Sequence, residues 1–172
     1  RPIAIDDYFK LKSVRNPQIS PDGEWVAYTL RETDLKKDKS ETRLWMIPAK
    51  GGATIPMTAT GYSASTPRWS PDGQYLSFMA SKGKGSKTQV WTLNRLGGEA
   101  QQLTKIKYGS LSTAQWSPDG KRLLLTIRDP KPEELTEDKE DDKKPKPHVI
   151  DRLQFKRDYA GYLDRRRTHL YV

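Results

Sequence analysis

The sequence predicts an all-β protein, an incomplete β-propeller of four-stranded antiparallel blades with a short N-terminal helix in front. Three observations carry this prediction. A turn motif occurs three times at nearly equal spacing, an alternating apolar strand follows each copy, and a further strand-and-turn pattern follows the first two. A repeat of about 40 to 50 residues with four short strands is typical of a propeller blade, whose sheet buries its faces by stacking on neighbouring sheets.

The turn motif is Ser-Pro-Asp-Gly, at residues 20–23, 70–73 and 117–120, and successive copies lie 50 and 47 residues apart. Proline fixes φ at about −65° for the second position of a turn. Aspartate can hydrogen-bond the nearby backbone, and glycine accepts the positive φ that closes the turn. Each copy therefore predicts the hairpin between the first and second strands of a blade.

Apolar residues recur at every second position after each motif. They are Val26, Tyr28 and Leu30, then Leu76, Phe78 and Ala80, then Leu123, Leu125 and Ile127. A period of two predicts a strand with one face in a core and the other partly covered. Residues 44–58 and 90–104 then combine an apolar strand containing Trp, a Gly-Gly pair and a Met-Thr or Leu-Thr step, which predicts the third and fourth strands.

The predicted organisation is a lead-in over residues 1–16, a first blade over 17–58, a second over 67–104 and a partial third over 114–172. Asp6 is the predicted cap of a helix that carries Tyr8, Phe9 and Leu11, and Asn16-Pro17 ends the lead-in because a residue before proline avoids the helical region. Charged residues 31–43 are predicted to connect the second and third strands of the first blade.

The chain ends at residues 169–172, which match the third strands of the first two blades. Two and a half blades are fewer than the roughly 4 to 8 of complete propellers. We therefore expect a fragment of a longer polypeptide whose total blade number the sequence does not give, and the start at Arg1 also suggests trimming or processing. Unpaired sheet faces favour self-association into a homo-oligomer or contact with the rest of the polypeptide.

A long insertion is predicted at residues 129–167, between the second and third strands of the third blade. It is about 33 residues longer than the corresponding segment of the second blade, and loops of that length are usually functional or disordered. Residues 129–149 hold eight acidic residues, five lysines and four prolines, a composition that cannot form a core. Residues 150–167 mix aromatic and arginine side chains and are predicted to be ordered.

Several classes of function are not expected. The net charge of +9 invites nucleic-acid hypotheses, but the basic residues are spread through loops and no nucleic-acid motif is present. Residues 81–88 superficially resemble a phosphate-binding loop, but they lack its spacing and join two strands where such a loop should open a helix. No apolar run approaches the ~20 residues that span a bilayer. No cofactor is predicted.

Catalytic and metal-binding residues are also not expected in this chain. There is no Gly-x-Ser-x-Gly elbow, and neither His148 nor His169 is in a context expected of a catalytic base. Two separated histidines without cysteine make no metal-ligand cluster, and the acidic tract of residues 137–142 lacks the spacing of a calcium loop.

The repeated Trp-Ser-Pro-Asp-Gly pattern, the lead-in of residues 5–23 and the series Asp-Arg-Leu, Gly-Tyr-Leu-Asp, Arg-Arg and His-Leu-Tyr-Val in residues 151–172 resemble one family over essentially the whole chain. The chain resembles the N-terminal β-propeller of the prolyl oligopeptidase family of serine peptidases, in its acylaminoacyl-peptidase and dipeptidyl-peptidase branch, and its repeats resemble those of TolB. This resemblance implies an α/β-hydrolase domain, absent here, that supplies the catalytic residues. It also implies a propeller that admits only short peptides and helps to bind them.

The resemblance further implies that long propeller loops contribute substrate contacts. The candidates for contacting a peptide carboxylate or carbonyl are Arg152, Arg157, Tyr159, Tyr162, Arg165, Arg166 and Arg167. The alternative, that these side chains pin the insertion to neighbouring parts of the protein, is favoured over direct contact with the substrate. At the level of the whole chain, the alternative function is a TolB-like propeller that binds proteins without catalysis. We expect a periplasmic or secreted location, with a cytoplasmic one as the alternative.

Overall fold

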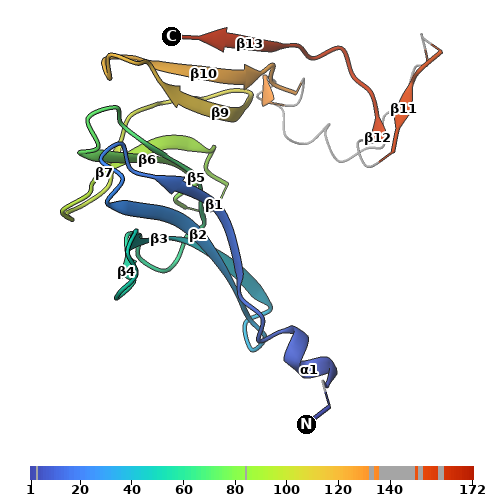
Figure 1. Ribbon diagram of the computed structural model, residues 1–172. Helices are drawn as coiled ribbons and strands as arrows, with labels where there is room; N and C mark the ends of the chain where they lie inside the picture. The colour runs from blue at the N-terminus through green and yellow to red at the C-terminus, as the bar shows by residue number, and fades with distance from the viewer. Residues whose placement is uncertain (3, 84, 132–133, 136–149, 151–152, 159–160) are drawn as a thin grey trace.

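The computed structural model consists almost entirely of antiparallel β-sheet (Figure 1). It describes residues 1–2, 4–83, 85–131, 134–135, 150, 153–158 and 161–172. The first sheet contains β1 (Ser13–Ile19), β2 (Trp25–Asp34), β3 (Lys39–Pro48) and β4 (Ile55–Pro56). The second contains β5 (Ala64–Trp69), β6 (Tyr75–Ala80), β7 (Gln89–Asn94) and β8 (Gln101–Gln102). The third contains β9 (Ser110–Trp116), β10 (Leu123–Arg128) and β13 (Thr168–Tyr171).

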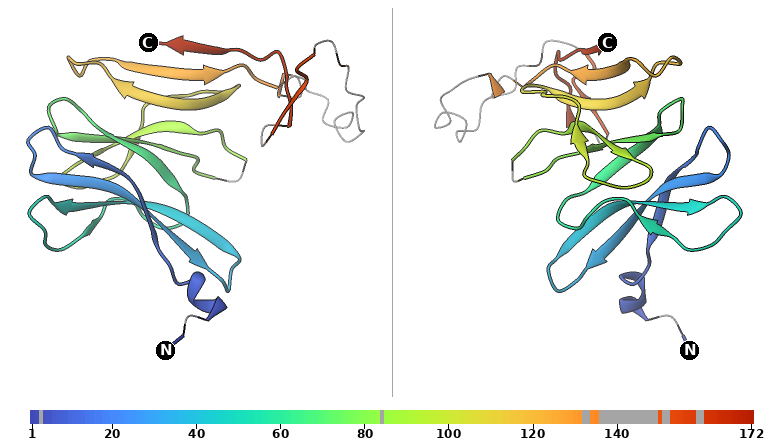
Figure 2. Two further views of the ribbon diagram at one scale, coloured as in Figure 1. Left: turned by 45° about the vertical axis from the view of Figure 1, so that its right-hand side comes forward. Right: turned by 90° about the vertical axis from the view of Figure 1, so that its left-hand side faces the viewer.

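Strands that follow one another in the chain are neighbours in each sheet, with orders β1-β2-β3-β4, β5-β6-β7-β8 and β13-β10-β9. The three sheets lie on one another as layers (Figures 1 and 2). A separate two-stranded pair, β11 (Lys156–Arg157) and β12 (Gly161–Tyr162), lies within the insertion. The prediction of an all-β chain with four-stranded antiparallel sheets is confirmed.

The lead-in forms less helix than predicted. Helix α1 (Ile5–Tyr8) is a single turn. Asp6 lies inside it and Ala4 occupies the capping position, so the predicted capping by Asp6 is wrong. The carboxylate of Asp7 instead accepts the N–H of Ala4 at 3.0 Å and binds the Arg1 guanidinium at 2.6 Å. No helix in the described part of the chain is long and apolar enough to cross a membrane.

Strands β1, β5 and β9 begin three to four residues before the predicted blade starts at residues 17, 67 and 114. The earlier starts of β1 and β5 have the same cause. The pairing register with the next strand shifts between Arg15 and Gln18 in β1 and between Ser65 and Arg68 in β5. Proline donates no hydrogen bond, so Pro17 and Pro67 lie in bulges inside these strands rather than at their starts. The predicted charged connection 31–43 is likewise mostly strand, because β2 and β3 continue to pair up to a short turn.

The three Ser-Pro-Asp-Gly copies adopt the same hydrogen-bonded turn. In each copy the serine hydroxyl donates to the aspartate at 2.5 Å, and the backbone N–H two residues after the aspartate donates to the same carboxylate at 3.0–3.1 Å. The glycines have φ of +68° to +72°. The turns also stack, since a Cβ at Gly73 or Gly120 would contact the proline of the preceding copy at 3.4 or 3.5 Å. The predicted hairpin turns are therefore confirmed.

The core lies between the sheets. One cluster joins Ala27 and Leu44 of the first sheet to Leu76 and Phe78 of the second. Another joins Met79, Val90 and Leu111 and packs against the apolar side chains of β10. The second sheet is consequently buried on both faces. Tryptophans tie the layers together as well: the indole N–H of Trp69 donates to the Gln18 carbonyl at 3.0 Å, and that of Trp116 to the Ser77 hydroxyl at 2.9 Å.

In β2 the buried face differs from the prediction. Ala27 and Thr29 are buried, whereas Val26, Tyr28 and Leu30 are only half-buried. The residues of β6 and β10 that correspond to Val26, Tyr28 and Leu30 in the repeat pack against the preceding sheet. No sheet precedes the first one among the described residues, so that face of β2 remains partly open to solvent.

The first turn is also held by an ion pair with the second sheet, between Asp22 and Arg95 at 2.5 Å. Hydrogen bonds from Ser20 and then Arg95 lower the pKa of Asp22 from 3.8 to about 2. A lowered folded-state pKa means that the charged carboxylate stabilises the fold above pH 3.8, and that this contribution is lost as pH falls from 3.8 through about 2.

We therefore expect Asp22→Asn to be less stable than the unmodified chain at pH 6 and to lose less stability on acidification to pH 2. Urea unfolding at a series of pH values measures this difference. Asp158→Asn, at an exposed aspartate of the insertion, is the control and should follow the unmodified chain. Equal acid sensitivity in Asp22→Asn and the unmodified chain would contradict the assignment.

Candidate functional site

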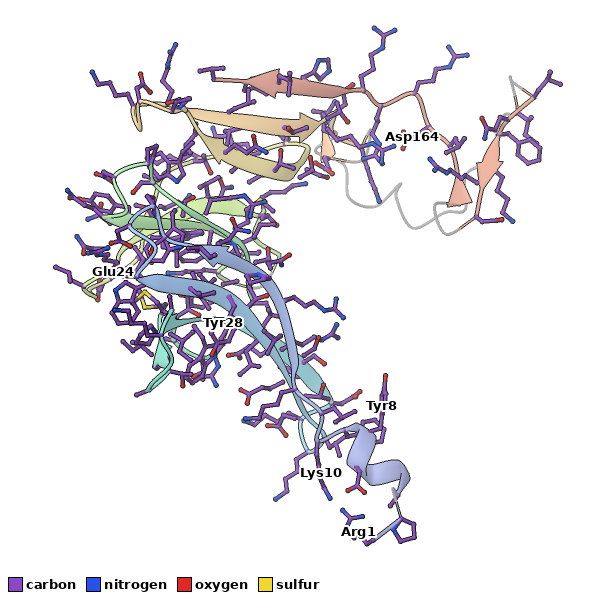
Figure 3. All side chains as sticks on the ribbon, in the orientation of Figure 1. Arg1, Tyr8, Lys10, Glu24, Tyr28 and Asp164 are labelled. Carbon is purple, nitrogen blue, oxygen red and sulfur yellow. The ribbon has the colours of Figure 1, made fainter. Side chains whose placement is uncertain are left out.

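The insertion and the Ser-Pro-Asp-Gly turns lie at opposite edges of the layered sheets. Figure 3 shows Glu24, in the first turn, at one edge and Asp164, in the insertion, at the other. Antiparallel order explains this arrangement, because turns between first and second strands share one edge while connections between second and third strands share the opposite one. The tip of the β2–β3 hairpin and the described residues 81–83 and 85–88 lie at the same edge as the insertion (Figure 2).

Asp129 closes the base of the insertion against the start of β13. Its backbone N–H donates to the Arg167 carbonyl at 2.8 Å, and its carboxylate accepts the Arg167 N–H at 2.8 Å. The same carboxylate lies 2.8 Å from Nε2 of His169. The bond from the Arg167 N–H, and then that from His169, lower the pKa of Asp129 despite opposing desolvation.

Asp164 forms a second closure beside the first. It accepts hydrogen bonds from the guanidinium of Arg128, in β10, at 2.8 Å and from that of Arg166 at 2.6 Å. Desolvation raises the pKa of Asp164, but its bonds to Arg166 outweigh this and leave the pKa lowered. We call Arg128, Asp129, Asp164, Arg166, Arg167 and His169 together the insertion clamp.

Glu134 attaches the first half of the insertion to the second and third sheets. Its carboxylate binds the ammonium of Lys87 at 2.6 Å and the N–H of Gly109 at 2.9 Å, and these contacts lower its pKa. Lys87 also donates to the Gly109 carbonyl at 3.2 Å. Both ends of the insertion are therefore held at the same edge of the sheets.

The predicted site residues do not converge on one described centre. Arg157 is exposed on β11, and Tyr162 takes its backbone place opposite Lys156 in β12. Arg165 is exposed, while Arg166 and Arg167 belong to the insertion clamp. Arg152, Tyr159 and His148 lie outside the described residues. The side chain of Arg166 binds Asp164 within the insertion, and Arg167 contributes only its backbone N–H and carbonyl. Substrate contact and pinning by these side chains both stay predictions.

The clamp residues Arg128, Asp129 and Asp164 were missed at the sequence level. Their partners are far away in sequence, with 35 residues between Arg128 and Asp164. The available signal was the Asp-Arg-Arg-Arg run at residues 164–167, which places an acid next to three bases without showing which base it binds.

The clamp does not have the geometry of a hydrolase triad. An aspartate beside a histidine supplies two of the three groups, but the described residues place no serine hydroxyl in hydrogen-bond contact with His169. Within the described ranges, no group of three or more His, Cys, Asp or Glu side chains is arranged to hold a metal ion. The arrangement holds a loop in place and presents its outer part at the edge of the sheets.

Asp164→Asn is expected to loosen the base of the insertion. Arg128 and Asp164 are each more than two-fifths exposed, so their bond should contribute only about 1 kcal/mol, equivalent to about fivefold in local opening. Limited trypsin digestion should therefore cleave after residues 165–167 about fivefold faster than in the unmodified protein. Asp158→Asn is the matched control, and equal cleavage rates in the two variants would show that Asp164 does not hold the insertion.

The chain is similar in sequence to a peptidase and similar in fold to solved peptidase structures. No protein-family model matches the sequence. The uncharacterized peptidase YuxL of Bacillus subtilis is 34% identical over 160 residues, which cover 92% of this chain and 24% of YuxL. The structure of Pyrococcus horikoshii acylaminoacyl peptidase matches 96% of this chain and 23% of its own, with a TM-score of 0.70 and 21% identity.

The β-propeller domain of the Trilobed protease from Pyrococcus furiosus matches 68% of this chain and 34% of its own, with a TM-score of 0.54 and 25% identity. The chain spans about a quarter of the length of YuxL. It is a homologue of a peptidase, and its predicted resemblance to the β-propeller region of the prolyl oligopeptidase family is confirmed.

Proposed function

We propose that this chain is the propeller portion of a serine peptidase, and that the three sheets are successive propeller blades. The observation that carries the proposal is the 34% identity to a peptidase over 92% of the chain. Because the match spans 24% of that relative, the proposed catalytic serine, histidine and aspartate belong to an α/β-hydrolase domain in the remaining polypeptide. Acylaminoacyl- or dipeptidyl-peptidase chemistry is the reaction class that the sequence resemblance supports.

In this proposal the propeller allows only short peptides to reach the active site, and side chains of the insertion contact the bound peptide. The insertion clamp supports this role, because a long loop tied at its base can present side chains in a constant position. Arginines suit the task, since a guanidinium pairs with a carboxylate in fixed geometry. The alternative of a non-catalytic TolB-like module is not favoured, because the curated relative is a peptidase.

The proposal is tested on the full-length polypeptide with a fluorophosphonate probe, which labels activated serines, and with acylated-peptide and dipeptide substrates. We expect labelling and hydrolysis by the full-length protein and neither by residues 1–172 alone. A full-length protein that remains unlabelled would overturn the proposal. In an active enzyme, Arg157→Ala should raise KM with little change in kcat, and an unchanged KM across peptide substrates would remove Arg157 from the contacts.

A further inference from the structure

A cleft of about 500 Å³ lies beside β7 and β8 of the second sheet, and none of the insertion clamp residues lines it. Its walls come from Lys82, Ser86 and Lys87 of the connection between β6 and β7 and from the segment that leads into β9. Lysines and aromatic residues dominate its lining: Lys82, Lys87, Lys107, Trp91 and Tyr108. Neither the proposed hydrolysis nor the clamp uses this cleft.

The floor of the cleft is held firmly by Gln89. Its side-chain oxygen accepts hydrogen bonds from the Thr104 hydroxyl and the Ile106 N–H, both at 2.8 Å. Its side-chain nitrogen donates to the Ile106 carbonyl at 2.8 Å. Gln89 is buried, so these bonds fix the segment before Lys107 and Tyr108 against β7. The cleft is therefore built on ordered backbone.

Aromatic rings position one of its charges. The Lys82 ammonium lies 3.8 Å from the ring centre of Trp91 and 4.7 Å from that of Tyr62. Such cation–π contacts orient an ammonium without neutralising it. Trp91 is itself held by an indole hydrogen bond to the Ala80 carbonyl at 3.2 Å.

The charge of the cleft is not balanced by the described residues. Lys87 is paired with Glu134. Among the residues that the structure describes, no carboxylate lies within salt-bridge distance of Lys82 or Lys107, and Lys107 is exposed. Tyr108 is 54% exposed and adds an aromatic surface to the same cleft.

We propose that this cleft binds a carboxylate-bearing, partly apolar peptide segment, with Lys82 and Lys107 contacting the carboxylate and Tyr108 contacting the apolar part. Residues 81–88 join two strands, so this connection is not the loop-to-helix phosphate site that its glycines and lysines superficially resemble. Lysine side chains that line one cleft together with aromatic residues suit a carboxylate with an apolar neighbour. The inference is independent of the proposed hydrolysis, because no residue of the insertion lines the cleft and binding there needs no catalysis.

The test measures fluorescence anisotropy of a labelled Phe-Glu-Phe-Glu peptide of D-residues, which resists hydrolysis, with the full-length protein. The matched probe is Phe-Gln-Phe-Gln. We expect Lys82→Gln and Lys107→Gln each to weaken binding of the acidic probe about fivefold, as for the loss of one exposed ion pair. Lys82→Arg should restore binding, since it keeps the charge over the rings. Lys50→Gln, at an exposed lysine in the turn before β4, is the control.

Three results would overturn the proposal. Unchanged affinity in both Lys82→Gln and Lys107→Gln would show that the cleft does not bind the probe. An equal loss in Lys50→Gln would show attraction by the overall positive charge. Competition by inorganic phosphate as strong as that by the acidic peptide would show that any anion is bound. Peptidase activity plays no part in these outcomes, so failure here and failure of the proposed function are distinguishable.

Discussion

Phe78→Ala is expected to lower the free energy of unfolding by about 3–5 kcal/mol, the usual range for removing a buried phenylalanine. Phe78 is 1% exposed and packs in the cluster that joins the first and second sheets. Its loss leaves a cavity that neighbouring side chains on two sheets cannot readily close. The effect should appear as a lower midpoint of urea unfolding, followed by tryptophan fluorescence.

Tyr75→Ala is the matched control on the same strand, because Tyr75 is 40% exposed and should lose about 1 kcal/mol or less. If Phe78→Ala does not fold, Phe78→Leu keeps most of the volume and should fall between the two. Equal midpoints for Phe78→Ala and Tyr75→Ala would contradict a core shared between the sheets.

Gly109→Ala is expected to cost about 2–5 kcal/mol. Gly109 has φ of +80°, a conformation that costs a residue with a side chain about 1–2 kcal/mol. A Cβ there would also overlap the carbonyl oxygen of Arg128, and relieving such crowding costs about 1–3 kcal/mol more. The displaced backbone would disturb the bonds of Gly109 to Glu134 and Lys87.

Gly85→Ala separates these two contributions. Gly85 has a similar φ of +76°, but among the described residues no atom beyond its chain neighbours lies within 4 Å of the position that a Cβ would take. It should therefore show only the backbone cost, about 1–2 kcal/mol in urea unfolding. If the two alanine variants lose the same stability, the close approach of Gly109 to Arg128 has no energetic consequence.

The turns and the number of sheets could be predicted because they depend on local backbone properties. Ser-Pro-Asp-Gly forms its hydrogen bonds within a few residues, whatever surrounds it. The alternation after each copy identifies strands by their period alone. The bulges at Pro17 and Pro67 were missed, because proline is equally compatible with a strand start and a bulge.

The buried face of β2 could not be predicted from its pattern. Val26, Tyr28 and Leu30 are more apolar than Ala27 and Thr29, yet the smaller residues are the buried ones. Burial depends on which face meets another sheet, and the face of Val26 is the one that meets a preceding sheet in the other two repeats. A periodic pattern identifies two faces but does not state which neighbour each one has.

The candidate site was predictable only as a region. The insertion was evident from the changed spacing of the third repeat. The pairing of Asp164 with Arg128 and of Asp129 with Arg167 and His169 was not evident. With 31 basic and 22 acidic residues in the chain, many other pairs of opposite charge are equally compatible with the sequence.

The sequence by itself thus determined the repeat, its turns, its strands and the place of the insertion. These features follow from φ preferences and side-chain alternation, which act over a few neighbouring residues. The tertiary structure decided which faces are buried, how the turns stack, and which charges close the insertion and which surround the cleft at Lys82 and Lys107. Those features need contacts between residues tens of positions apart, and only the stacking of the sheets selects such contacts.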